Sequence, residues 1–346
     1  MARVNFHLSF TQITGSGVYP TLLKELVKNA EELGWDGITH GDEALLPPQG
    51  KGFLEGGHGS QYNQGHMSCL PLLAHFAAVT RKIQLSSNIL IAPLYHPVHV
   101  ANIGATIDNL SGGRFTLRTG TGLFPWEFEY FGLPWEHRGK ILVESIEFIR
   151  ALWTQDVVNY KGEYFHLENA SLAAQKPIQK PHPPIWIGTA GNKEYLLKRV
   201  AKYADGWDMV YHWPSGKESH ELSHRHDKAT GVAQQFGDAV KFIKKEAKAA
   251  GRDPEAIRHS PGSMVLAIGK DDAQARKTAD EYLSKVRGED FSSPSSGDPA
   301  RVINYINEYV EVGATDFTVN FVPYNLPDTM QMMELFANEV IPNFRR

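Results

Sequence analysis

Residues 82–122 carry the clearest βαβ pattern in this chain, and they begin with the apolar run Ile83-Gln84-Leu85-Ser86-Ser87-Asn88-Ile89-Leu90-Ile91-Ala92-Pro93. A helix-like block and the turn Ser111-Gly112-Gly113-Arg114 follow, and a second strand then reads Phe115-Thr116-Leu117-Arg118-Thr119 before Gly120-Thr121-Gly122. Both strands end in small or polar residues. Because the carboxyl ends of the strands build the active site of a βα barrel, this unit predicts where the chemistry lies.

The same alternation of strand-like and helix-like segments runs through almost the whole chain. The expected strands are Val4–Phe10, Gly37–Gly41, Ile83–Leu90, Phe115–Thr119, Pro184–Thr189, Gly206–Tyr211, Ser263–Gly269 and Asp316–Phe321. Amphipathic stretches with helical spacing lie between them, including Tyr19–Leu33, Gly139–Trp153, Gly237–Ala250 and Val302–Val312. Eight strands with intervening helices predict an α/β fold, a (β/α)8 TIM-like barrel.

Composition bounds the class of protein. The chain has 346 residues, 42% of them hydrophobic, with a formal net charge of −4 and a single cysteine, Cys69. Such a chain can bury a large core, and we see neither a membrane-spanning run nor a secretory signal, so we expect a cytoplasmic protein. The scattered basic residues argue against nucleic-acid binding.

Three segments interrupt the alternation, at about 44–66, 155–183 and 212–235. The first is rich in Gly and Pro and suits a lid, with surface decoration as the alternative; the second predicts a hairpin, Val157–Tyr160 with Tyr164–Leu167; the third is polar and rich in His. We find no repeat or linker, so we expect residues 1–346 to form one domain with these insertions.

The residues expected at the strand ends are polar but carry little charge: Phe10, His40, Asp42, Glu43, Asn88, Thr119, Thr121, Thr189, Asp208 and Asn320. Amide and hydroxyl groups of this kind suit the edge of a heterocycle better than a metal centre. Farther along, Gly188-Thr189-Ala190-Gly191-Asn192 joins a strand to a helix. Such a junction offers free N–H groups to an anion, although an ordinary turn is the alternative.

Several blocks in a fixed order resemble one family. They are Ala30-Glu31-Glu32-Leu33-Gly34-Trp35-Asp36-Gly37, Ser87–Pro93 with His96-Pro97, Asp108–Phe115, Glu129–Gly132 with Arg138 and Glu144, Leu152-Trp153, Tyr160–Phe165, Pro177–Gly188 and Ala204–Trp207. Together these blocks resemble the bacterial luciferase-like superfamily of flavin-dependent or deazaflavin-dependent oxidoreductases.

The resemblance implies a barrel that binds reduced FMN or F420 at its mouth, with the ring near the third and fourth strands. Family members often hold a non-proline cis peptide after the third strand, which here falls at Asn88-Ile89. The residues implied for cofactor binding are Phe10, Asn88, Thr119, Gly120, Thr121, Gly188, Thr189, Ala190, Gly191 and Asn192.

Two departures from the family bear on mechanism. Many members have a histidine where Glu43 stands here, and the F420-dependent sugar-phosphate dehydrogenases have a glutamate where Leu123 stands. We therefore favour FMN, with F420 as the alternative cofactor. His40 or Glu43 is the candidate acid or base, together with Asn88.

An FMN monooxygenase oxidises a small organic substrate with O2 and needs a separate NAD(P)H:flavin reductase; the family also implies a homodimer or homotetramer. Aromatic side chains would keep water away from the flavin, with ordinary core packing as the alternative role. These residues are Phe10, Phe124, Trp126, Tyr130 and Trp207. Arg138 is a candidate for binding the cofactor phosphate or a substrate anion; a surface ion pair with Glu144 on the same helix is the alternative.

Two other function classes compete with this interpretation. His220-Glu221-Leu222-Ser223-His224 matches the H-E-x-x-H pattern of zinc hydrolases, but its polar surroundings favour a solvated loop. A barrel that binds flavin without catalysis is the third hypothesis.

Overall fold

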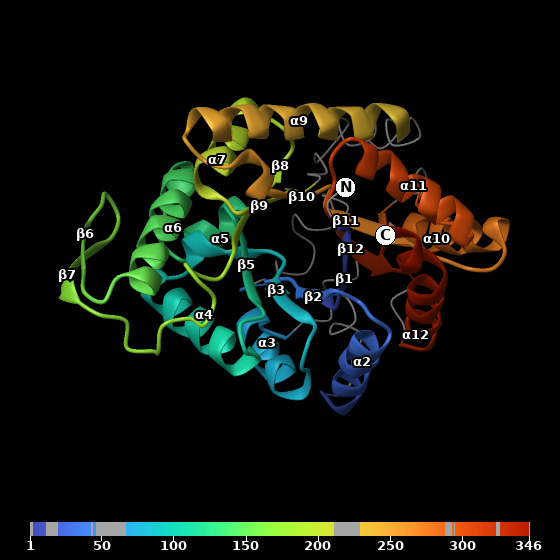
Figure 1. Ribbon diagram of the computed structural model, residues 1–346, viewed down its shortest axis with the longest axis horizontal. Coiled ribbons are helices and arrows are strands. Elements are labelled where there is room, and N and C mark those ends of the chain that lie inside the picture. Colours follow the sequence, from blue (N-terminus) through green and yellow to red (C-terminus); the bar gives the residue numbers. More distant parts are fainter. Residues whose placement is uncertain are drawn as a thin grey trace.

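The computed structural model describes residues 3–11, 20–42, 44–45, 67–210, 229–287, 293, 295–322 and 326–345 (Figure 1). The strands are β1 (Asn5–Ser9), β2 (Gly37–His40), β3 (Gln84–Ser87), β4 (Leu90–Ile91), β5 (Phe115–Gly120), β6 (Val158–Lys161), β7 (His166–Ala170), β8 (Ile185–Ala190), β9 (Gly206–Val210), β10 (Arg258–Ser260), β11 (Ser263–Leu266) and β12 (Asp316–Phe321).

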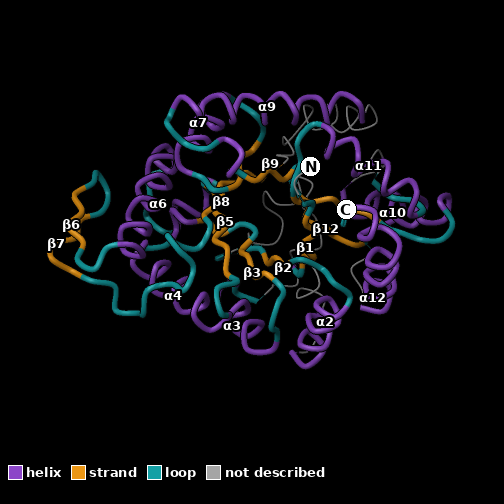
Figure 2. Tube along the Cα trace, viewed as in Figure 1, coloured by secondary structure: helices purple, strands orange, loops and turns teal. Residues whose placement is uncertain are grey.

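The helices lie between these strands and around them (Figure 2). They are α2 (Pro20–Glu32), α3 (Cys69–Val79), α4 (Pro97–Ser111), α5 (Pro125–Tyr130), α6 (Arg138–Thr154), α7 (Glu194–Tyr203), α9 (Ala229–Ala249), α10 (Asp272–Arg287), α11 (Pro299–Glu311) and α12 (Leu326–Leu335), with short turns η2 (Ala92–Leu94), η3 (Trp135–His137), η5 (Pro254–Ala256), η6 (Phe336–Val340) and η7 (Ile341–Phe344). No described helix has the length and apolar character needed to cross a membrane.

Local sequence signals place several helix ends. Asp298 caps α11 by accepting a hydrogen bond from the Arg301 amide at 2.8 Å, and Pro299 takes the first helical position. Helix α4 ends at Gly112, because this residue adopts the left-handed conformation at φ 72°. The turn predicted from Ser111 to Arg114 is therefore confirmed.

The main sheet is parallel, with the order β10-β9-β8-β5-β3-β2-β1-β12-β11. Its two end strands are successive pieces of one segment, separated only by Pro261 and Gly262. The Thr315 amide before β12 donates to the His259 carbonyl of β10 at 2.8 Å. The sheet thus curls round until its ends meet, and the predicted α/β barrel is confirmed.

Strand boundaries differ from the prediction at two places. The run Ile83–Leu90 is wrong as one strand, because the chain breaks between β3 and β4 at Asn88 and Ile89. We also missed β10, since Arg258–Ser260 is short and polar. The predicted hairpin is confirmed as the antiparallel pair β6–β7, which extends away from the barrel in Figure 1.

The barrel interior contains polar side chains that contact one another across the sheet. Arg118 on β5 is buried and reaches across to Asp208 on β9, with Nη1 3.0 Å from Oδ2, and to the Thr318 hydroxyl on β12 at 3.3 Å. Its guanidinium carbon also lies 4.3 Å from the ring centroid of Trp186 on β8. These contacts link four strands through one side chain.

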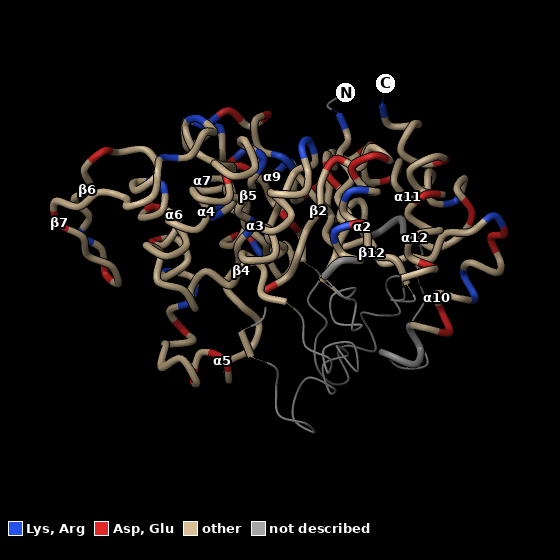
Figure 3. Tube along the Cα trace, turned by 90° about the horizontal axis from the view of Figure 1, so that it is seen from below, with Lys and Arg blue, Asp and Glu red and all other residues tan. Residues whose placement is uncertain are grey.

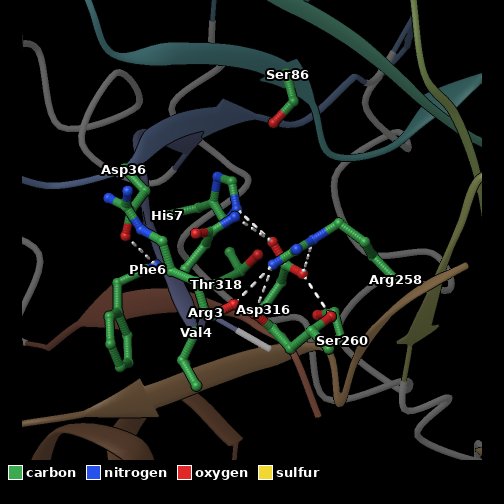
Figure 4. A network of polar contacts seen from close by, with 12 residues as sticks. Arg3, Val4, Phe6, His7, Asp36, Ser86, Arg258, Ser260, Asp316 and Thr318 are labelled. Carbon is green, nitrogen blue, oxygen red and sulfur yellow. Dashed lines mark hydrogen bonds and ion pairs between the residues drawn. The ribbon is translucent and has the colours of Figure 1, made fainter. Parts of the chain in front are cut away.

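A second interior network joins His7, Asp316 and Arg258 (Figure 4). Asp316 Oδ1 lies 3.1 Å from His7 Nε2, and its Oδ2 lies 2.7 Å from Arg258 Nε. Burial alone would raise the pKa of Asp316, but the hydrogen bonds and charges of His7 and Arg258 hold it well below its ordinary value. This carboxylate stays charged and ties β12 to β1 and β10.

Candidate active site

The carboxyl ends of the strands lie on the side of the molecule that carries α5, opposite the two chain termini (Figure 3). Barrel enzymes place their chemistry at this end, because the βα loops there bring side chains from several strands together. The described part of this mouth is formed mainly by the segments that follow β2, β4, β5 and β8.

The break after β3 shapes the centre of the mouth. The Asn88-Ile89 peptide bond is cis, as predicted. The Ile89 side chain then lies over Gly188 of β8, where an added Cβ would overlap Ile89 Cδ1, and close to Gly120 of β5. Both glycines therefore make room for Ile89. Whether they also contact a cofactor stays a prediction.

The other residues expected to bind cofactor lie around this centre. The Thr119 hydroxyl is buried and donates to the Leu90 carbonyl at 3.0 Å. Thr189 is also buried: its hydroxyl accepts from the Trp207 indole and donates to the Gly191 carbonyl, each at 2.8 Å. Ala190 and Asn192 are exposed just before α7, and Thr121 is half-buried after β5. The structure thus brings these residues to one end of neighbouring strands.

Some expected mouth residues face the helices instead. His40 is buried, with Nε2 2.7 Å from the Met67 carbonyl that precedes α3. The Phe10 ring packs on Phe76 of α3, with centroids 5.4 Å apart. Trp207 stacks on Phe236 of α9 at 5.3 Å, so it belongs to the helix layer and not to a wall at the mouth.

Other sequence hypotheses cannot be placed here. Glu43, nearly all of the segment 44–66 and the H-E-x-x-H motif at His220 and His224 lie outside the described residues. Within the described part of the chain, no group of three or more His, Cys, Asp or Glu side chains has a geometry that could hold a metal ion.

A pair of arginines lies where α6 begins. The Arg138 guanidinium stacks 3.6 Å above the Trp135 ring centroid and donates to the Trp135 carbonyl at 2.8 Å. Arg199 of α7 reaches the same place: a Cβ on Gly139 would lie 2.6 Å from Arg199 Nη2. Burial lowers the pKa of Arg199, Tyr195 opposes this shift, and the charge of Arg138 lowers it further. Neither arginine forms an ion pair with a carboxylate of the described chain.

The expected alternative, an Arg138–Glu144 pair, is wrong. The Glu144 carboxylate instead accepts hydrogen bonds from the amides of Glu163, Tyr164 and Phe165, at 2.6–3.1 Å, in the turn of the β6–β7 hairpin. The Glu144 carboxylate therefore does not neutralise the charge of Arg138.

Asp42, expected at the mouth, has two neighbours there that sequence reasoning missed, Tyr95 and Glu127. Asp42 follows β2 and accepts a hydrogen bond at 2.9 Å from the hydroxyl of Tyr95, which follows η2. Glu127 of α5 is fully buried nearby, and neither of its carboxyl oxygens has a hydrogen-bond partner among the residues that the structure describes. The one sequence signal that could have found Glu127 is its position next to Phe128, on the side of the short helix α5 that packs against the core.

The comparisons with known proteins identify the family. The model of the luciferase-like monooxygenase family matches residues 5–297. This chain belongs to that family. The luciferase-like chain is 36% identical to the pyrimidine monooxygenase RutA of Allorhizobium ampelinum over 151 residues, which are 42% of this chain and 40% of RutA. It thus spans less than half the length of that relative.

Two further relatives cover more of the chain. An FMNH(2)-dependent dimethylsulfone monooxygenase of Pseudomonas putida is 27% identical over 292 residues, 78% of this chain and 76% of that protein. The solved structure of the F420-dependent tetrahydromethanopterin reductase from Methanopyrus kandleri aligns with a TM-score of 0.73 at 22% identity, covering 99% of the luciferase-like chain and 100% of the other. At that identity the structural likeness shows the fold alone.

Proposed function

We propose that this luciferase-like protein is a monooxygenase that uses reduced FMN and O2 to oxidise a small organic substrate. The observation that carries the proposal is the match over 78% of the chain to an FMNH(2)-dependent monooxygenase. The name of RutA points to the same class. F420 is the alternative cofactor, favoured by the F420-dependent enzyme of the same fold.

The donor set of the chain fits a cofactor that carries a phosphate. Arg138 and Arg199 form no ion pair with a carboxylate within the described residues, and no side chain there caps the backbone N–H groups at the start of α7, the helix that carries Arg199. Gly191, at φ 82°, has open space where a side chain would be. We therefore expect the phosphate between the two guanidinium groups and the turn Gly188–Asn192.

Other residues of the mouth suit the ring. Ile89 offers an apolar surface over Gly120 and Gly188. Phe124 and Trp126, which follow β5, stack on each other with ring centroids 5.9 Å apart. Such a surface excludes water. When bound, reduced FMN supplies the electrons that activate O2, and we expect a separate NAD(P)H:flavin reductase to deliver it.

Anaerobic titration with FMNH2, reduced riboflavin and reduced F420 tests this assignment. We expect FMNH2 to bind most tightly. The variant Arg199→Gln should weaken FMNH2 binding about 10- to 100-fold, since a hydrogen bond to a charged group is worth about 1.5–3 kcal/mol, and leave riboflavin binding unchanged. Lys198→Ala, the exposed neighbour on α7, is the matched control.

Two results would change the assignment. Tight F420 binding with weak FMNH2 binding would replace the monooxygenase by an F420-dependent hydride-transfer enzyme. Equal losses for FMNH2 and riboflavin in Arg199→Gln would remove the phosphate site from between the two arginines.

A further inference from the structure

Three segments far apart in sequence bring Asp42, Tyr95 and Glu127 together at the mouth of the barrel. Asp42 lies two residues beyond β2, Tyr95 directly follows η2, and Glu127 is in α5, after β5. The hydrogen bond from Tyr95 joins residues 53 positions apart in the chain. The group is therefore a product of the barrel and not of a local motif.

Both carboxyl groups are removed from water. Asp42 is 6% exposed and Glu127 is 0% exposed. Of their four oxygens, Oδ1 of Asp42 accepts from Tyr95, while Oδ2 of Asp42 and both oxygens of Glu127 are buried and have no hydrogen-bond partner among the described residues. Two buried carboxylates whose donors, Tyr95 and the Ile91 backbone, both serve Asp42 would be strongly disfavoured, because an ionised carboxylate needs charges or donors around it.

A proton between the two groups removes this difficulty. Within the described part of the chain, the titratable groups that act on this pair include Tyr95 and Cys69, neither of them a cation. Cys69 at the start of α3 donates its S–H to the His40 carbonyl at 3.2 Å. No described cation is paired with either carboxyl group. One neutral and one charged carboxyl group is then the arrangement that costs least.

We propose that Asp42 and Glu127 form an acid–base pair at the barrel mouth that holds one exchangeable proton at neutral pH, with Tyr95 fixing Asp42 in place. Glu127 carries the proton and Asp42 the charge. When the pair acts, the O–H bond of Glu127 breaks, an O–H or N–H bond forms on the ligand, and no electron is transferred; the reverse step recovers the proton.

The electrostatics support this division of roles. Burial, followed by the charge of Asp42, raises the pKa of Glu127 to about 7. Burial raises the pKa of Asp42 to about 6, against the opposing hydrogen bonds from Tyr95 and the Ile91 backbone. Two interacting carboxyl groups of this kind titrate as a pair near neutral pH.

Infrared difference spectra of the ligand-free protein between pH 5 and pH 9 test the pair without any cofactor. We expect the C=O band of a protonated carboxyl group at pH 7, lost in Glu127→Gln and kept in Glu129→Gln, the exposed carboxyl group on the same helix. In Asp42→Asn the band should remain, with its midpoint about one pH unit lower because the neighbouring negative charge is gone. This second variant keeps the test open if Glu127→Gln does not fold.

Absence of the band from the wild-type protein at pH 7, or its persistence in folded Glu127→Gln, would overturn the proposal. An unchanged midpoint in Asp42→Asn would show that the charge of Asp42 does not act on Glu127, and would overturn the pair. Because these measurements need no flavin, their outcome does not depend on whether the assignment of FMN is correct. With reduced cofactor and substrate supplied, the alkaline limb of the rate profile should disappear in Glu127→Gln and stay in Glu129→Gln.

Discussion

Arg118 and Asp208 form a buried ion pair across the barrel, with 3.0 Å between Nη1 and Oδ2, and both side chains are at most 2% exposed. The pair joins β5 to β9 although 90 residues separate the two partners in the chain. Arg118 also contacts Trp186 and Thr318, so this one side chain fills the space that apolar residues occupy in many barrels.

Asp208→Asn should lower the free energy of unfolding by about 3–5 kcal/mol, because it leaves the Arg118 charge buried without its partner. The control is Glu163→Gln, which breaks an exposed 3.3 Å pair with Lys140 and should cost at most about 1 kcal/mol. Urea denaturation measures both. Equal costs for the two variants would contradict the interpretation of a buried, irreplaceable pair.

His259 predicts a loss of stability in acid. His259 is 1% exposed, and neither ring nitrogen has a hydrogen-bond partner in the described part of the chain. Burial, followed by the charge of Lys244, lowers its pKa to about 3, against about 6.5 in the unfolded chain. The unfolded state therefore binds the proton first. Above pH 6.5 this titration does not lower the free energy of unfolding. Between pH 6.5 and pH 3 it lowers the free energy of unfolding by at most about 1.4 kcal/mol per pH unit.

His259→Leu should make the unfolding free energy less dependent on pH between 6.5 and 4, while its effect at pH 8 reports packing alone. Some slope should remain, because burial, with the charge of Arg118, also lowers the pKa of His7. Denaturant titrations at several pH values check this. A slope identical to that of the wild type would show that His259 is not neutral in the folded state.

Gly188→Ala should destabilise the barrel by about 1–3 kcal/mol, since the new Cβ would overlap Cδ1 of Ile89 and force that side chain to move. Ile89→Val removes this methyl group. Gly188→Ala should therefore cost less when it is introduced into Ile89→Val than into the wild type, a coupling that a double-mutant cycle measures. Additive effects would show that Ile89 moves aside freely.

Glu144→Gln should release the β6–β7 hairpin. The carboxylate accepts three backbone amides of the turn, and the amide group of glutamine cannot replace both oxygens as acceptors. Hydrogen exchange should become faster for the amides of residues 163–165 and stay unchanged in β5 and β8. Glu168→Gln, an exposed substitution on the same hairpin, is the control. Unchanged exchange in Glu144→Gln would contradict this role.

The sequence by itself determined the alternation of strands and helices, the hairpin and the turn after α4. These features follow from local rules, because the periods of apolar residues and the conformational needs of Gly112 are contained in short windows. The place of the cis peptide at Asn88 also followed from a short block, through the family resemblance.

Only the tertiary structure decided which polar side chains meet. Arg118 pairs with Asp208, Glu144 accepts hydrogen bonds from the hairpin turn, and Asp42 accepts one from Tyr95 near Glu127. Each contact joins residues that are far apart in the chain. Sequence patterns show which face of an element is buried, but not which partner lies opposite. That depends on the curvature and register of the closed sheet, and the candidate acid–base pair at the mouth arises from it.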